Sequence, residues 1–151
     1  MGRIFRWLGG SSTLANLARY QQIYMNLTGL LRGKKAEEQA ASYLQNQGLI
    51  ILAKNARYKC GEIDIIAIHK DTHVFVEVKY RKNNHHGESS EMVSASKQAK
   101  VAKASKLWLQ ENDPNFEKGC RFDVIAITKG HKDGEELNIQ WIKNAFTPEL
   151  W

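Results

Sequence analysis

Two absences narrow the class of protein before any motif is considered. No part of the 151-residue sequence approaches the ~18 uninterrupted apolar residues that a membrane-spanning helix needs. The N-terminal residues include Arg3 and Arg6, but their apolar run is too short for a secretory signal. We therefore expect a cytoplasmic protein without an integral membrane segment.

Cysteine is also scarce. Cys60 and Cys120 are the only two, which excludes a disulfide framework, and they lack the paired spacing of a structural zinc site. We expect both to be reduced thiols. The composition, 42% hydrophobic and 25% charged, is that of an ordinary globular protein, and the length suits one domain with a sizeable core.

Acidic residues are absent from the first 36 positions. Residues 37–151 hold 16 basic and 16 acidic side chains, so the net charge of +6 comes wholly from the N-terminal segment. Total charge therefore says little about what the rest of the chain binds. We expect a basic helical extension over 1–32 and a separate domain over 33–147. The basic residues of the first 36 positions are Arg3, Arg6, Arg19, Arg32, Lys34 and Lys35.

The spacing of apolar residues predicts an α/β fold with a mixed sheet, in the order α-β-β-β-α-β-β. We expect the core to take Trp108 and Leu109, and Asp123 to pair with Arg121. The predicted elements are a helix over 14–24 stopped by Thr28-Gly29, a helix over 33–47 closed by Gly48, strands over 49–53, 62–68 and 74–80, a helix from Ser94 or Ser96 to about Gln110, and strands over 122–128 and 137–142, with a polar turn over 57–61.

The two strands over 62–68 and 74–80 carry the informative pattern. Side chains alternate faces along a strand, so Glu77 and Lys79 share one face, roughly 6.6–7 Å apart along the chain. If the loop between the strands holds an even number of residues centred between 70 and 71, Asp64 lies directly opposite Glu77. An odd-numbered loop breaks this register.

Two carboxylates placed opposite each other in a mostly apolar hairpin repel, and burial raises that cost. A divalent cation between Asp64 and Glu77 removes the conflict, because hard cations prefer carboxylate oxygen. The alternative is that the two acids form structural ion pairs with Lys79, Arg57 or Arg81. The spacing by itself leaves both interpretations open.

The segments Gly61-Glu-Ile-Asp-Ile-Ile-Ala67 and Phe75-Val-Glu-Val-Lys-Tyr-Arg81 resemble the YraN family of bacterial proteins. More distantly, they are similar to archaeal Holliday junction resolvases and the PD-(D/E)XK nuclease superfamily. The resemblance covers about 33–146 and includes the GKKAEEQA segment at 33–40, Lys97-Gln98 and the RFDV segment at 121–124. One departure is Ile63, which stands where the superfamily has proline; the resolvase branch tolerates this.

The resemblance implies a restriction-endonuclease-like domain and a Mg²⁺- or Mn²⁺-dependent, structure-selective endonuclease acting on nucleic acid, with DNA as the expected substrate. Asp64 and Glu77 match its metal-binding acids, and Lys79 matches the lysine beside the attacking water and the scissile phosphate. Glu37 matches a first-helix glutamate of the resolvase branch. Resolvases act as dimers, which implies a homodimer here.

Basic and polar residues flank this expected site. We expect Arg57, Arg81, Lys82 and Gln98 to contact nucleic acid, although solvated loop charges are the alternative. The lysines at 97, 100, 103 and 106 wind around a helix at 3.6 residues per turn, which favours a solvated surface.

Two other functions stay open. One is a nucleic-acid-binding module without useful cleavage, and the other is an adaptor whose basic N-terminal helix docks on a membrane or a protein partner. The intact acid-acid-lysine set favours the enzyme. Met25 is an alternative start, because the resemblance begins only near residue 33.

Overall fold

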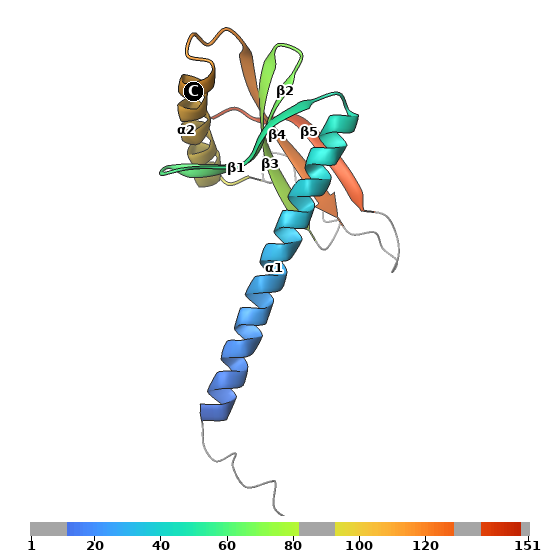
Figure 1. The fold of residues 1–151 in the computed structure, drawn as a ribbon, viewed down its shortest axis with the longest axis vertical. Coiled ribbons are helices and arrows are strands. Elements are labelled where there is room, and N and C mark those ends of the chain that lie inside the picture. The colour runs from blue at the N-terminus through green and yellow to red at the C-terminus, as the bar shows by residue number, and fades with distance from the viewer. Residues whose placement is uncertain (1–11, 82–92, 129–136, 149–151) are drawn as a thin grey trace, which may run out of the picture. The chain divides into compact units, whose positions relative to one another are not determined.

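The computed structural model describes residues 12–81, 93–128 and 137–148, with side chains from residue 17 onward (Figure 1). The chain divides into two compact units between Lys34 and Lys35. The predicted α/β class, with a mixed sheet and the order α-β-β-β-α-β-β, is confirmed. The elements are α1 Ser12–Asn46, β1 Ile50–Tyr58, β2 Gly61–His69, β3 Thr72–Arg81, α2 Ala95–Asn112, β4 Gly119–Thr128 and β5 Asn138–Phe146.

The first helix corrects the sequence prediction. Two helices separated at Thr28-Gly29 were expected, but α1 is one helix from Ser12 to Asn46. An interior glycine costs only about 1 kcal/mol relative to alanine, and no proline follows it. The Thr28 hydroxyl donates to the Met25 carbonyl at 3.0 Å, so it is satisfied inside the helix. Gly48 closes the helix as predicted, with φ +87°.

The sheet has the strand order β1-β2-β3-β4-β5, in which β3 and β4 are parallel and the other neighbours are antiparallel. β1 was predicted over 49–53 with a turn over 57–61, which is wrong, because the strand continues to Tyr58. Its polar second half still pairs with β2 as far as Tyr58 and Gly61. β1 is an edge strand, and polar side chains are tolerated there because they face water.

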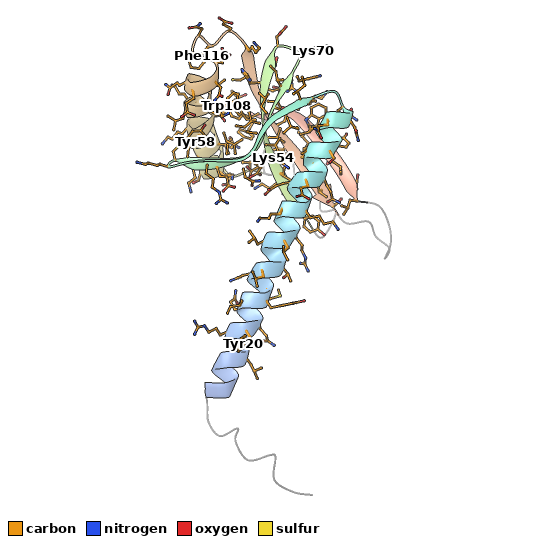
Figure 2. All side chains as sticks on the ribbon, in the orientation of Figure 1. Tyr20, Lys54, Tyr58, Lys70, Trp108 and Phe116 are labelled. Carbon is orange, nitrogen blue, oxygen red and sulfur yellow. The ribbon has the colours of Figure 1, made fainter. Side chains whose placement is uncertain are left out.

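Two apolar clusters cover opposite faces of the sheet. The C-terminal part of α1 packs Ala40 and Leu44, both fully buried, against the face that holds Val74 and Val76. α2 packs against the other face, and its Trp108 meets the ring of Phe75 edge-on at 5.9 Å between centroids. Figure 2 shows Trp108 on α2 beside the sheet. Trp108 and Leu109 are both buried in this core, as predicted. Neither helix in the described ranges has the length and apolar character needed to cross a membrane.

The hairpin between β2 and β3 has the predicted register. Its loop is Lys70 and Asp71, with Lys70 at φ +56° at the tip (Figure 2). His69 pairs with Thr72, and the ladder continues to Ile65 opposite Val76, where it ends. β2 keeps pairing with β1 as far as Gly61. β2 and β3 therefore separate at Asp64, and we call this point the strand fork.

Candidate functional site

Asp64 lies at the strand fork. The backbone ladder ends one residue before it, so Asp64 and Glu77 do not form the next backbone pair. Instead, the Val78 N–H donates to Asp64 Oδ2 at 2.8 Å. Where β2 turns away, the Val78 N–H has no acceptor on that strand. The Asp64 carboxylate accepts from it instead, so the backbone donor stays hydrogen-bonded. This contact holds Asp64 beside β3.

Glu77 and Lys79 form the second part of the site. The side chain of Glu77 is only 4% exposed, and its Oε1 accepts from Lys79 Nζ at 2.8 Å. The shared face predicted for these two side chains is confirmed by this contact. The ion-pair interpretation also holds for Glu77. Arg57 pairs with Glu62 at 3.4 Å instead of with either acid of the site.

Lys97 is a member of the site that the sequence interpretation missed. It stands in the first turn of α2, and its Nζ lies 3.2 Å from Glu77 Oε2. Its predicted role as a solvated surface lysine is therefore wrong, whereas Lys100, Lys103 and Lys106 are exposed as expected. The signal that points to it is its position, because a cation in the first turn of a helix opposes the helix dipole and gains from an acidic partner.

Electrostatics at the site are unfavourable for a second negative charge. Burial, together with the charge of Glu77, raises the pKa of the Asp64 carboxyl to about 7. The Val78 hydrogen bond and the charge of Lys97 act in the opposite direction. Glu37, half-buried on α1, adds a further negative charge close enough to raise this pKa. The structure thus brings Asp64, Glu77 and Lys79 together and places the charge of Glu37 within electrostatic range.

The donor set fits a divalent cation. Two carboxylates on neighbouring strands supply the hard oxygen ligands that Mg²⁺ and Mn²⁺ prefer. Glu77 Oε2 is buried and has no aligned hydrogen-bond donor, so it keeps an acceptor direction unused. Within the described ranges, no three or more Asp, Glu, His or Cys side chains lie close enough together to hold a metal ion among them. A cation here would have Asp64 and Glu77 as its protein ligands, and Mg²⁺ commonly keeps several waters in such sites.

Three of the other predicted contact residues lie in the described ranges, on β1, on β3 and in α2. Arg57 on β1 has a side chain that is 77% exposed, and Arg81 is half-buried at the end of β3. The Gln98 side-chain amide donates to the Val93 carbonyl at 2.8 Å, which fixes it at the start of α2. Lys82 lies outside the described residues. Their contact with nucleic acid stays a prediction.

Asp123 has a structural environment. It is fully buried, and the predicted ion pair is confirmed, with Arg121 Nε 3.0 Å from its Oδ1. Trp141 Nε1 donates to it at 2.9 Å and the Asn144 N–H at 3.0 Å. Because both oxygens accept from these donors, Asp123 stabilises the β4–β5 region, where the register of the two strands shifts.

The fold and site define a mixed-sheet α/β protein with an acid-acid-lysine cluster at a strand fork. The family model of the uncharacterised protein family UPF0102 matches residues 36–127, and the chain belongs to this family. A UPF0102 protein of Francisella tularensis subsp. tularensis strain WY96-3418 is 48% identical over 115 residues, which cover 76% of this chain and 92% of that protein. A UPF0102 protein of Vibrio cholerae serotype O1 strain M66-2 is 43% identical over 117 residues, covering 77% and 92%. The YraN family corresponds to UPF0102, so the resemblance seen in the sequence is confirmed.

Proposed function

We propose that this protein is a metal-dependent, structure-selective endonuclease that hydrolyses phosphodiester bonds in nucleic acid, with DNA as the substrate. The observation that carries the proposal is the convergence of Asp64, Glu77 and Lys79 at the strand fork, with Glu77 buried and hydrogen-bonded to Lys79 at 2.8 Å. Three charged groups held in a partly buried cluster are costly for stability alone, and perturbed carboxylates cluster at functional sites.

Each side chain has a distinct role in this proposal. Asp64 and Glu77 hold Mg²⁺ or Mn²⁺, and Glu37 holds the same ion through water or helps to bind a second ion. The bound ion supplies a more acidic water and a polarised phosphate. Lys79 is oriented by Glu77, and its side chain is 31% exposed. Its ammonium stabilises the negative charge that develops on the phosphate.

A nucleic-acid-binding module without useful cleavage is the second candidate. It is favoured by the two lysines that already lie within ion-pair distance of Glu77, one at each oxygen. A cluster neutralised by its own lysines has less need of a metal ion. In that protein, Lys79 and the flanking basic residues grip phosphates and perform no chemistry.

An adaptor function is the third candidate, and it rests on the first unit of the chain. Large apolar side chains are exposed along α1 in this unit, which is also the basic part of the sequence. Docking on a membrane surface or a protein partner covers such residues. These side chains are Leu17, Tyr20, Ile23, Tyr24, Met25, Leu27, Leu30 and Leu31.

We also propose a homodimer, by analogy with the resolvases that the sequence resembles.

Lys79→Ala separates the enzyme from the binding module. Branched, flapped, single-stranded and duplex substrates are tested with Mg²⁺ or Mn²⁺, by single-turnover cleavage and by equilibrium binding at two salt concentrations. In an enzyme, the change lowers the cleavage rate by about 10²–10³ with little loss of affinity, because the interaction is made in the transition state. Lys106→Ala, which removes an exposed lysine of α2, is the matched control.

The opposite pattern identifies the binding module. If the protein is a binding module, the wild type cleaves none of these substrates, while Lys79→Ala weakens nucleic-acid binding and reduces the salt dependence of that binding. That combination overturns the endonuclease.

A further inference from the structure

Glu77 has two ammonium partners that come from different elements. Lys79 is two residues away on the same strand, whereas Lys97 reaches it from the first turn of α2. The acid-acid-lysine set has a role for one lysine only. The second lysine therefore needs its own explanation.

The two contacts differ in quality. Lys79 Nζ makes an aligned hydrogen bond to Glu77 Oε1 at 2.8 Å. Lys97 Nζ lies 3.2 Å from Oε2, but that buried oxygen has no aligned hydrogen-bond donor. Lys97 therefore neutralises Oε2 by charge alone, and of the two ammonium groups it is the easier to remove.

The position of Lys97 also makes it exchangeable. Ser94 caps α2 by accepting from the Lys97 N–H at 3.3 Å, so the side chain begins at the positive end of the helix dipole. That field disfavours an ammonium, and α2 has no acidic residue in its first turn to offset it. The side chain is 31% exposed on a flexible stem, which gives the ammonium a short route to water.

We propose that Lys97 is the resident cation of the metal-free site, and that a divalent metal ion displaces its ammonium from Glu77 Oε2 when it binds. This inference rests on the proposed function, because it assigns a role at the same site. Lys97 keeps the buried Glu77 oxygen neutralised before the metal arrives, and it lowers the affinity for the metal by competing with it.

Calorimetric titration of Mn²⁺ and of Mg²⁺ into the wild-type protein and Lys97→Met tests the competition. Methionine has a similar length and no charge. We expect Lys97→Met to bind the metal about tenfold or more tightly than the wild type, the size of a lost charged contact. Lys106→Met is the control, because nine residues at 100° each place Lys106 on the opposite side of α2. It should leave the affinity unchanged.

Thermal unfolding gives a readout that needs no activity. In EDTA, Lys97→Met should melt about 2–4 °C below the wild type, since Glu77 Oε2 loses its neutralising charge. Saturating Mg²⁺ should restore the variant more than it stabilises the wild type. Lys97→Gln, which can donate one hydrogen bond to Glu77, replaces Lys97→Met if the latter does not fold.

The outcomes separate this inference from the proposed function. Tighter binding by Lys97→Met, or binding by the variant alone, supports the displacement. Equal or weaker binding by the variant overturns the displacement and leaves a metal site in place. If neither protein binds a metal ion, both the displacement and the metal-dependent endonuclease are overturned.

Discussion

Replacing Asp64 by asparagine removes the charge at the strand fork and keeps an oxygen that accepts from the Val78 N–H. The raised pKa of Asp64, about 7 against an ordinary 3.8, means that its ionised form is disfavoured in the folded protein. At a pH above 7 the wild-type protein therefore folds with an unfavourable charge. The neutral asparagine side chain resembles the protonated acid and avoids this cost.

The magnitude follows from the size of the pKa shift. About three pKa units at 1.36 kcal/mol each correspond to about 4 kcal/mol. The NH₂ group of the asparagine reduces this gain in stability by about 1–2 kcal/mol if it has no hydrogen-bond acceptor. We expect Asp64→Asn to raise the free energy of unfolding of the metal-free protein by about 2–3 kcal/mol at about pH 8.

The sign of the pH dependence is fixed by the direction of the shift. The unfolded carboxyl loses its proton near pH 4, whereas the folded one keeps it to about pH 7. This group therefore contributes stability at low pH that is lost as the pH rises from about 4 to about 7. Near pH 4 the wild type and Asp64→Asn should have nearly equal stability, and the difference should grow until about pH 7.

Denaturation by urea in EDTA, at about pH 4.5 and about pH 8, measures the difference. Asp71→Asn is the control, because Asp71 is an exposed aspartate at the hairpin tip. A gain of the same size at both pH values, or no gain at about pH 8, refutes the electrostatic strain assigned to Asp64. Saturating Mg²⁺ should reduce the advantage of the variant, since a bound cation stabilises the wild-type carboxylate.

Four further outcomes follow from the structure. Asp64→Asn combined with Glu77→Gln should abolish Mg²⁺ and Mn²⁺ binding by calorimetry, and unchanged binding contradicts the metal site. Deleting residues 1–24 should leave the core folded by circular dichroism and any cleavage intact, while weakening non-specific binding to nucleic acid or lipid; an unfolded product shows that this segment belongs to the core. Asp123→Ala should cost about 3–5 kcal/mol in urea unfolding, because it strands buried donors around a lost charge; a loss below about 1 kcal/mol refutes that role. Gly61→Ala should cost about 1–3 kcal/mol, because its Cβ meets a backbone oxygen of α2 at 2.8 Å; wild-type stability contradicts this close approach.

The β2–β3 part of the site was the most predictable from sequence. Alternation along a strand has a period of two, so the shared face of Glu77 and Lys79 follows once the strand is assigned. The two-residue loop then fixes the register that brings Asp64 close to Glu77. The strand fork was not predictable, because β2 leaves β3 where it continues to pair with β1 over the largely polar residues 54–58, which were predicted as loop and turn.

Lys97 shows why the rest of the site was missed. Its contact with Glu77 joins a helix to a strand 20 positions earlier, and no local period reports such a distance. The evenly spaced lysines of α2 pointed instead to a solvated surface. The false helix stop at Thr28-Gly29 has a local cause, since glycine breaks a helix only when its neighbours support another conformation.

The strand fork separates the strand that holds Glu77 and Lys79 from the hairpin of β1 and β2. Beyond Asp64, the hairpin of β1 and β2 pairs within itself and no longer with β3, and it packs against α2 through Tyr58, Cys60 and Gly61. Charge changes at its exposed tip residue, Lys59, leave the parallel pairing of β3 with β4 untouched. Relatives with the same acids can therefore carry a different residue at this tip without a change in the strands that hold Glu77 and Lys79.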